Sequence, residues 1–515
     1  MLLAVCVAAS HGMIVTNTFA PQTRSVALVA LGCPKNTVDA EVMLGDLQRS
    51  GLKVVREPNE ADIVIVNTCA FVEDAKSESI AAVIEAAQIK QDRLTPAKGL
   101  FVTGCLAQRY AEELANEVST PQIDGGDVPF PTHAFDSCAL FLQLPEVDAV
   151  VGFEHYKDLP AQVLDLLNRE PVDEAATSAL EAISDGRVTS AKRPKVMVGS
   201  ASVPFRPETE RVSLTAQHTA YIRVAEGCDH ACSFCAIPGF RGTFRSKPFD
   251  TVVAEAERLV ANGVRELNLI AEDTNQYGSD WGTKDTRRLA DLLHVLAENP
   301  QLKWIRLLYC YPSYFSEELI DAIAGIDKVC KYIDIPLQHL SSPVLQRMKR
   351  PGGKATRALL RKLRERIPNL TLRTTFICGF PGETNDEHKE LVKYARELRF
   401  ERGGAFSYSS EDGTPAAEME DQVPDDVREA RRDELISLFQ DHAEAWANAQ
   451  VGRRLNVIID RMDGLDAVGR TEGDAPDIDG SVRLPECVLA PGTNLAVDVV
   501  AADVMELVAQ PVTDA

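Results

Sequence analysis

The sequence predicts an α/β protein of three successive parts: a small parallel-sheet α/β domain, a central partial, TIM-like (β/α) barrel and a small carboxyl-terminal β-barrel. Buried-strand patterns alternate with helical patterns from about residue 25, and six more such units follow from about residue 220. This alternation predicts parallel sheets. After residue 450, short strand patterns separated by Gly, Pro and Asp predict the β-barrel. We expect an extension over 1–24, a first domain over 25–165, a linker over 166–216, a central domain over 217–448 and a last domain over 449–515.

Composition and charge narrow the class of protein. Of the 515 residues, 45% are hydrophobic and 25% are charged, as is ordinary for a globular chain. The formal net charge of -23 argues against a bulk nucleic-acid binder and favours a basic macromolecular partner. Twelve cysteines are too sparse for a disulfide scaffold, so we expect metal sites in a reducing compartment, the cytoplasm. No apolar run reaches the roughly 18 residues of a membrane span, so no membrane partner is expected.

The first residues are apolar, but no Lys or Arg precedes Arg24, so the charged start of a signal peptide is missing. Two interpretations remain: a disordered extension, with a true start at Met13, or a poor organellar transit peptide.

The first domain shows a strand followed by a helix three times, and a fourth strand after a loop insertion over about 119–140. A parallel sheet binds its ligands outside the carboxyl ends of its strands. Its expected strands are 26–31, 61–66, 99–103 and 149–153, and its expected helices are 38–50, 75–91 and 108–118.

Three cysteines of this domain follow strand ends. Cys33, Cys69 and Cys105 lie 36 residues apart in both intervals, about one βα unit each. They should therefore meet at one edge of the sheet. An iron–sulfur cubane normally takes four cysteines, so three ligands would leave one iron open. The alternative is three buried core cysteines, which are common singly; Cys138, in the loop insertion, is interpreted as incidental.

The central domain opens with a second cysteine triad. Cys228, Cys232 and Cys235 follow the first strand at CxxxCxxC spacing. Three thiolates cannot close a tetrahedral zinc site, which takes four ligands. We therefore interpret the loop as a second iron–sulfur site with an open, catalytic iron. The alternative is a zinc knuckle completed by His230 or a distant cysteine.

The remaining strands of the central domain predict further site residues, because active groups of such barrels lie at the carboxyl ends of the strands. The six expected strands are 220–225, 266–271, 304–309, 332–336, 372–378 and 404–409, and helices are expected near 249–262, 286–298, 315–327, 353–367, 385–400 and 425–450. The candidates at the strand ends are Glu272, Asp273, Tyr311, Pro312, Gln338, His339, Gly379, Gly382, Glu383, Tyr408 and Glu411.

Two charged stretches remain. Nine Lys or Arg and one Glu lie between Arg347 and Arg366, which indicates either a solvated face or a contact for an acidic partner. The expected barrel has strand patterns at 456–459, 466–469 and 495–500 and is rich in acids, among them Glu472, Asp474, Asp477 and Asp479. Such a barrel suits a basic protein surface better than a phosphate backbone.

Several motifs resemble the methylthiotransferase family of radical S-adenosylmethionine (SAM) enzymes. GCPKN at 32–36, NTCAF at 67–71 and GC at 104–105 are similar to the family's first cluster site, and EGCDHACSFC at 226–235 is similar to its radical SAM site. IPLQH at 335–339, RMKRP at 347–351, FPGET at 380–384 and DQVP at 421–424 resemble the members that act on ribosomal protein S-twelve, rather than those that modify adenosine in tRNA.

The resemblance implies a methylthiotransferase domain, a radical SAM core and a TRAM domain, in that order. It implies two [4Fe–4S] clusters, one on each cysteine triad, with SAM at the open iron of the second. The expected reaction inserts sulfur and a methyl group at the β-carbon of an aspartate of small-subunit ribosomal protein S-twelve and gives 3-methylthioaspartate. An electron donor is a further partner, and nucleic acid is not expected as the main one. The SAM or substrate region would include Glu272, Asp273, Gln338, His339, Gly379 and Glu383.

Two other functions stay open at this point. One is a tRNA adenosine methylthiotransferase, which the negative charge disfavours. The other is a non-catalytic zinc or electron-transfer protein.

Overall fold

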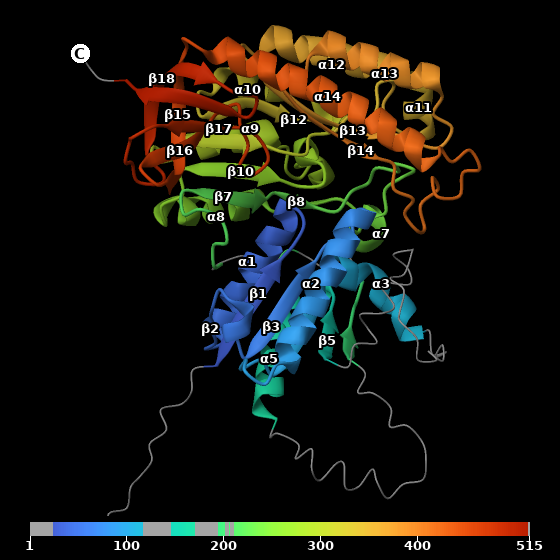
Figure 1. Ribbon diagram of the computed structural model, residues 1–515, viewed down its shortest axis with the longest axis vertical. Helices are drawn as coiled ribbons and strands as arrows, with labels where there is room; N and C mark the ends of the chain where they lie inside the picture. Colours follow the sequence, from blue (N-terminus) through green and yellow to red (C-terminus); the bar gives the residue numbers. More distant parts are fainter. Residues whose placement is uncertain (1–23, 117–145, 170–193, 201–204, 206–210, 513–515) are drawn as a thin grey trace, which may run out of the picture.

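The computed structural model describes residues 24–116, 146–169, 194–200, 205 and 211–512. Its first domain lies below the central domain in Figure 1, and the carboxyl-terminal barrel lies beside the central domain. The expected extension over 1–24, apart from Arg24, and the loop insertion over about 119–140 with Cys138 fall outside the described residues. No described helix is long and apolar enough to cross a membrane.

The first domain is a parallel sheet with helices on both faces. Its strand order is β2-β1-β3-β4-β5-β6, and all pairs are parallel. The central strands β3 and β4 are buried along their whole length, as expected from their apolar runs. The strands are β1 (Ser25–Ala30), β2 (Lys53–Val54), β3 (Ile63–Thr68), β4 (Gly99–Gly104), β5 (Val147–Val151) and β6 (Lys195–Met197), and the helices are α1 (Pro34–Arg49), α2 (Glu73–Gln91), α3 (Cys105–Asn116) and α5 (Leu159–Asn168).

Two strands of this sheet were not predicted. β2 is two residues long, and β6 is a three-residue edge strand that pairs with β5. β6 lies within the stretch that we expected to be a linker over 166–216. Both strands are too short to show a hydrophobic period, and the side chains of Lys195 and Val196 are exposed.

The central domain is a six-stranded parallel sheet with the order β14-β13-β12-β11-β10-β7. β14 and β7 are both edges, so the barrel is partial, and the predicted fold class is confirmed. Its largest apolar cluster lies between the strands and the helices that follow them. The strands are β7 (Thr219–Arg223), β10 (Glu266–Ile270), β11 (Trp304–Leu307), β12 (Val329–Asp334), β13 (Thr371–Cys378) and β14 (Arg402–Ser407).

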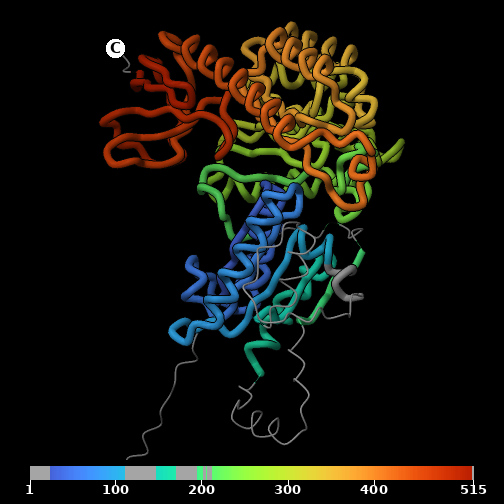
Figure 2. The backbone as a smooth tube through the Cα atoms, turned by 45° about the vertical axis from the view of Figure 1, so that its right-hand side comes forward, coloured from blue at the N-terminus to red at the C-terminus, as the bar shows by residue number. Residues whose placement is uncertain are grey.

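The helices of the central domain cover the outside of the strands, and α14 runs along β14 (Figures 1 and 2). A short hairpin, β8 (Ala225–Glu226) with β9 (Arg245–Ser246), frames the cysteine loop. The helices are α7 (Ile237–Arg241), α8 (Phe249–Ala261), α9 (Leu289–Ala297), α10 (Glu317–Gly325), α11 (Ser342–Arg347), α12 (Gly353–Arg366), α13 (Asn385–Leu398) and α14 (Asp425–Gln450).

The basic stretch between Arg347 and Arg366 is largely paired with acids of neighbouring helices. Arg361 contacts Glu397 at 2.8 Å, and Arg364 contacts Glu401 at 2.9 Å. Lys362 and Arg366 pair with Glu317 of α10. Four of the six basic side chains of α12 therefore pair with acids of the same domain, which favours the interpretation as a solvated, internally paired face.

The carboxyl-terminal part is a closed five-stranded barrel in the order β15-β16-β17-β19-β18. Its interior is a separate apolar cluster. β17 and β19 were not predicted as strands. The strands are β15 (Arg454–Asp463), β16 (Asp466–Thr471), β17 (Ser481–Leu484), β18 (Asn494–Ala502) and β19 (Glu506–Pro511).

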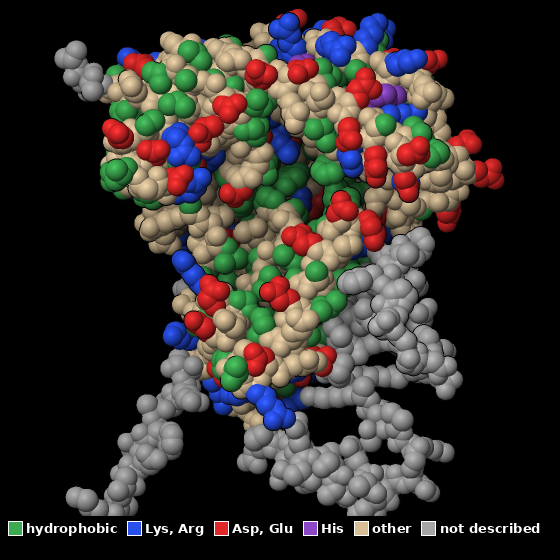
Figure 3. All heavy atoms as spheres, in the orientation of Figure 1, with side chains coloured by type: hydrophobic (Ala, Val, Ile, Leu, Met, Phe, Trp, Pro, Cys, Tyr) green, Lys and Arg blue, Asp and Glu red, His purple; other side chains and the backbone are tan. Residues whose placement is uncertain are grey.

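Acidic side chains of this barrel face the central domain. Asp474 accepts from Arg402 at 2.6 Å, and Asp479 accepts from the Tyr332 hydroxyl at 2.6 Å. Both carboxylates are buried. Figure 3 shows acidic and basic side chains interspersed over the barrel's visible face. Our expectation that these acids form a docking face for a basic protein is therefore wrong for Asp474 and Asp479, because the central domain already neutralises them.

Candidate functional site

The first cysteine triad lies at the carboxyl edge of the first sheet. Cys33 is the N-cap of α1 and is separated from the end of β1 by Leu31 and Gly32. Cys69 directly follows β3, and Cys105 directly follows β4 as the first residue of α3. β1, β3 and β4 are adjacent and parallel, so the topology brings the three cysteines to one edge. All three thiols are free of disulfides.

Two glycines make room for this triad. Gly32 has φ +86°, and a Cβ there would lie 2.7 Å from the Cys69 Cβ and 2.9 Å from its Sγ. Gly104 has φ +97°, and a Cβ there would lie 2.3 Å from the Thr68 carbonyl oxygen. Any other residue would be strained at either φ and would also collide with a neighbour.

Buried amides hold the loops that carry the cysteines. The Asn36 side chain donates to the carbonyl oxygens of Leu31 and Thr68 at 3.0 and 2.9 Å, and the Asn67 side chain donates to the Asn36 carbonyl at 2.9 Å. Burial raises the pKa of Cys69 to about 11 and that of Cys105 to about 12. The metal-free thiols therefore hold their protons at neutral pH. A metal that binds them must displace those protons.

The second triad lies on the loop between β8 and α7. Burial raises the pKa of Cys228 and of Cys235 to about 12. The loop is anchored where Ser233 donates to the Arg347 carbonyl at 2.8 Å and Cys228 N–H donates to the Gly242 carbonyl at 3.1 Å. Arg350 lies 3.6 Å from the Cys232 Sγ and stacks over the Tyr311 ring at 4.5 Å.

His230 of this loop contacts Asp273 and Tyr311. Its Nε2 shares a hydrogen bond of 2.7 Å with Asp273, and its ring stacks on Tyr311 with centroids 3.6 Å apart. Among the residues that the structure describes, no three His, Cys, Asp or Glu side chains are arranged to hold a single metal ion. The thiolates of a cubane bind different irons and need not converge on one point. The two triads of free thiols are therefore compatible with cubane clusters.

Arg241, the last residue of α7, connects the two triads. It lies six residues after Cys235, yet its Nη2 reaches the Cys105 Sγ at 3.5 Å. The same guanidinium donates to Asp39 at 3.1 Å and to Glu226 at 2.7 Å. The side chain is buried, with 3% exposure. The carboxylates and the thiol around it hold the pKa of Arg241 well above its usual value, although burial alone would lower it.

Lys35 and Glu272 lie where the two domains meet. Lys35 Nζ donates to the Ala271 carbonyl at 3.2 Å and lies 3.8 Å above the Tyr309 ring. Glu272 follows Ala271, and both its carboxylate oxygens are buried without a hydrogen-bond partner among the described residues. Burial and the neighbouring Glu226 raise the pKa of Glu272, although Lys35 lowers it.

The other predicted residues divide into two groups. Asp273 is hydrogen-bonded to His230, which belongs to the loop of the second triad, and burial raises the pKa of Asp273. Gln338 has φ 68° and pairs in a backbone bridge with Phe376. His339 and Glu383 instead form a buried cluster with neighbours from α13 and α14. The pKa of Glu383 is lowered to about 2, because the imidazoles of His339 and His388, which lie 3.5 and 3.4 Å from its carboxylate, outweigh the effect of burial.

The candidates Gly379 and Tyr408 are closely packed against other side chains. Gly379 has φ +71°, and a Cβ there would lie 2.0 Å from the Arg428 side chain. Its N–H donates to Glu383, as part of the same cluster. Tyr408 is buried against the Phe380 ring, with centroids 5.6 Å apart.

Glu411 joins the two domains. It accepts from Lys76 of α2 at 2.9 Å and from Arg109 of α3 at 2.7 Å. These side chains are at most 8% exposed. Arg109 also donates to the Asp412 carbonyl at 3.1 Å. This ion-pair cluster holds the loop after β14 against the carboxyl edge of the first sheet.

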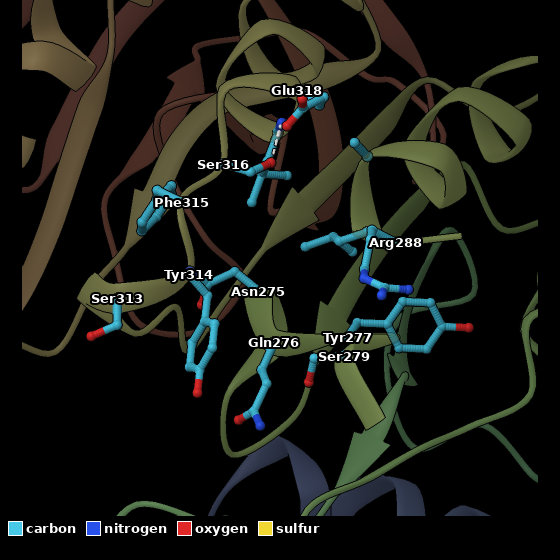
Figure 4. Close-up of a pocket in the computed structure, with 13 residues that line it drawn as sticks. Asn275, Gln276, Tyr277, Ser279, Arg288, Ser313, Tyr314, Phe315, Ser316 and Glu318 are labelled. Atoms are coloured by element: carbon cyan, nitrogen blue, oxygen red, sulfur yellow. Dashed lines mark hydrogen bonds between the residues drawn. The ribbon is translucent and has the colours of Figure 1, made fainter. Parts of the chain in front are cut away.

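A separate pocket of about 370 Å³ opens between the starts of α9 and α10. Tyr314, Gln276 and Ser279 point the same way along its lower edge in Figure 4. Tyr314 lies near the His230 ring, at 5.8 Å between centroids. None of the predicted site residues lines this pocket.

Sequence reasoning missed Lys35, Arg241 and Arg350, which all lie against the triads or their neighbours. Each falls within or beside a motif that we had quoted, at 32–36, after 226–235 and at 347–351. Position next to a ligand motif was the available signal. Their contacts join residues up to 236 positions apart, which no local pattern reveals.

Comparison with known proteins identifies the family. The chain matches the model of the uncharacterized protein family UPF0004 over residues 25–124, the radical SAM superfamily over 222–395 and the TRAM domain over 451–512. It is 40% identical over 461 residues to "Ribosomal protein uS12 methylthiotransferase RimO" of Desulfitobacterium hafniense, with 89% of this chain and 92% of the relative covered.

Two further relatives of the same name agree. The protein of Anaeromyxobacter sp. (strain Fw109-5) is 40% identical over 94% of this chain and 93% of its own length. That of Akkermansia muciniphila is 39% identical over 94% and 99%. The chain belongs to the RimO family of ribosomal protein uS12 methylthiotransferases. The resemblance stated from the motifs is confirmed, and this family membership makes the chain a radical SAM enzyme of the transferase class, with SAM and [4Fe–4S] clusters as its cofactors.

Among solved structures, the chain is similar to TsrM, a radical SAM methyltransferase from Kitasatospora setae. The TM-score is 0.47 at 17% identity, with 76% of this chain and 77% of that chain covered. This likeness is too distant to carry an argument about function.

Proposed function

We propose that this enzyme inserts sulfur and a methyl group at the β-carbon of an aspartate of ribosomal protein uS12 and so produces 3-methylthioaspartate. The observation that carries the proposal is the identity of about 40% to uS12 methylthiotransferases over nearly the whole length of both chains. The structure supports it with two cysteine triads, and Arg241, six residues after the second triad, contacts Cys105 of the first. The work would take place in the cytoplasm, with an external electron donor.

We assign one [4Fe–4S] cluster to Cys33, Cys69 and Cys105 and the other to Cys228, Cys232 and Cys235. The donor set supports this assignment, because each triad consists of free thiols on glycine-bearing loops and lacks a fourth cysteine in its motif. When bound, the clusters and SAM supply the radical, the sulfur and the methyl group, so the hard chemistry belongs to the cofactors.

The chain's own part is to orient the reactants and to exclude water. The Glu411 ion-pair cluster and Arg241 hold the two carboxyl edges against each other. Low exposure of these charges makes the junction dry, which protects reactive carbon centres from solvent. Glu272, Asp273 and Gln338 remain our candidates for the SAM or substrate region. His339, Gly379 and Glu383 would support that region from beneath.

We also propose the functional division of the chain: a sulfur-presenting domain over 25–165, a radical-generating core over 217–448 and a TRAM barrel over 449–515. The ion pairs between barrel and core support a stabilising role for the barrel.

The test uses the full chain, reconstituted anaerobically with iron and sulfide. With SAM, a strong reductant and uS12, the target peptide should gain one methylthio group, as measured by mass spectrometry. Cys69→Ala should abolish the gain but still allow SAM cleavage, because only the first triad is damaged. Cys232→Ala should abolish both, and Cys487→Ala, in the distant barrel, should change neither.

Two results would contradict the proposal. One is an unmodified uS12 with fully loaded wild-type enzyme. The other is methylthiolated adenosine in tRNA that depends on this chain while uS12 stays unmodified, which would indicate the tRNA-modifying function.

A further inference from the structure

Lys35 is a buried cation without an acidic partner. Its side chain is 7% exposed, and among the described residues no carboxylate lies within 4.0 Å of its ammonium nitrogen. One N–H donates to the Ala271 carbonyl, and the Tyr309 ring lies beneath the charge. An ammonium has three donors, so two are left over. A buried charge that lacks an anion is costly, which makes this position favourable for an anionic ligand.

The position of Lys35 relates it to both triads. It follows Cys33 by two residues, and its ammonium reaches Ala271 at the end of β10 and Tyr309 at the end of β11. It therefore crosses from the carboxyl edge of the first sheet to that of the central sheet. A ligand at Lys35 would lie between the two cysteine sites.

Other buried cations at the junction are already satisfied or face elsewhere. Arg241 donates to Glu226, Asp39 and Asn36. Arg350 donates to the Pro336 carbonyl and lies against Cys232. The Arg350 Nε also lacks a partner among the described residues, but the Arg350 guanidinium lies against Cys232, whereas Lys35 has two spare donors on one nitrogen at the domain junction.

We propose that Lys35 binds the side-chain carboxylate of the target aspartate and thereby selects an acid over its amide. The inference rests on the proposed function and deepens it. In that reaction the β-carbon must be accessible from both cluster sites. The carboxylate is bonded directly to this carbon, so its partner must also lie between the sites, as Lys35 does.

The test compares the affinities of the enzyme for two peptides. One peptide carries the uS12 target sequence, and the other has Asn in place of the target Asp. Binding of each to the reconstituted full chain with SAM, without reductant, is measured by fluorescence anisotropy under anaerobic conditions. We expect wild type to bind the Asp peptide about tenfold or more tightly than the Asn peptide, because a charge-assisted hydrogen bond is lost. Lys35→Met should reduce this ratio to about one, since the same hydrogen bond is then absent for both peptides.

Control variants separate this role from a structural one. Lys53→Met removes an exposed lysine of the same domain and should keep the wild-type ratio. Iron content and the EPR spectra of both clusters are recorded for every variant, because Lys35 is close to Cys33 in sequence. Lys35→Gln, which can still donate to the Ala271 carbonyl, replaces Lys35→Met if the latter loses iron. Lys35→Arg, which restores a cation, should recover part of the preference for Asp.

The outcomes of the test are distinguishable. If a fully loaded Lys35→Met or Lys35→Gln enzyme keeps the wild-type ratio of affinities for the Asp and Asn peptides, Lys35 does not bind the target carboxylate, and the proposed function is unaffected. The same holds if wild type modifies uS12 but shows no preference for Asp. If wild type neither binds nor modifies uS12, the proposed function is wrong, and so is the role of Lys35 that rests on it.

Discussion

Replacement of Arg241 should lower the reduction potential of the first cluster without removing it. Arg241→Gln deletes a positive charge that lies 3.5 Å from the Cys105 sulfur and the N–H···S bond that accompanies it. Reduction adds an electron to the cluster, and a nearby cation stabilises the added charge. Hydrogen bonds to cluster sulfurs act in the same direction.

The size of the shift follows from Coulomb's law. Two unit charges about 4 Å apart interact by about 4 kcal/mol at an effective dielectric constant of about 20. The added electron spreads over the whole cluster, so we take about 1.5 to 2 kcal/mol of this interaction as effective. For a one-electron couple, about 1.4 kcal/mol corresponds to about 59 mV. The potential should therefore fall by about 60 to 90 mV.

The assay is an EPR-monitored redox titration. It uses a background in which Cys228, Cys232 and Cys235 are replaced by Ala, so that only the first cluster contributes. Arg241→Lys keeps the charge and should retain most of the wild-type potential, and Arg49→Gln, at the exposed end of α1, should not change it. Equal potentials in the parent and in a fully loaded Arg241→Gln protein would refute the reasoning.

Three further changes test the site and its supports. Gly32→Ala should lose the first cluster and about half of the iron, because its Cβ would lie 2.7 Å from that of Cys69. Gly51→Ala, at φ +88° with open space around it, should keep all of the iron. Equal iron contents in the two variants would contradict the requirement for glycine beside Cys69. Glu411→Gln leaves buried Arg109 of α3 without its carboxylate and leaves Lys76 of α2 with Glu73 alone. The junction should therefore loosen by about 3 kcal/mol, seen as faster hydrogen exchange at the interface. Unchanged exchange would show that Glu411 does not hold the two domains together. The pKa of Glu383 is lowered to about 2 from an ordinary value of 4.5, so its carboxylate contributes about 3 kcal/mol to the free energy of unfolding above pH 4.5 and loses this contribution as the pH falls toward 2. The urea midpoints of Glu383→Gln and wild type should therefore differ at pH 7 and approach each other at pH 2. A difference that stays constant with pH would contradict this.

Local pattern and spacing predicted most of the architecture. The long helix α14 begins and ends where the charged helical stretch does, at 425 and 450, and the buried strands of the central sheet match their apolar runs within a few residues. The equal spacing of Cys33, Cys69 and Cys105 predicted that they meet at one edge, because βα units repeat with regular length. Parallel topology then places them there without further information.

Contacts between distant segments could not be predicted in this way. The ion pair between Lys76 and Glu411 joins residues 335 positions apart, and neither residue differs locally from a solvated charge. The acidic composition of the barrel was misleading. It predicted an exposed acidic surface for a basic partner, but Asp474 is buried against Arg402 of the central domain. The three-residue strand β6 escaped detection because a period of two needs more residues than it has.

The ion pairs between barrel and core limit how the chain can be divided. Glu266 of the central sheet is shared by Arg306 of the same sheet and Arg470 of the barrel, at 3.1 and 2.7 Å, and it is fully buried. Arg402 likewise depends on Asp474. Truncation before the barrel would leave Glu266 with Arg306 alone and would remove the acidic partner of Arg402, so the TRAM segment cannot be removed without exposing charges of the core. Chimeras that exchange it between relatives should keep folding only when the matching arginines and acids of the core are exchanged with it.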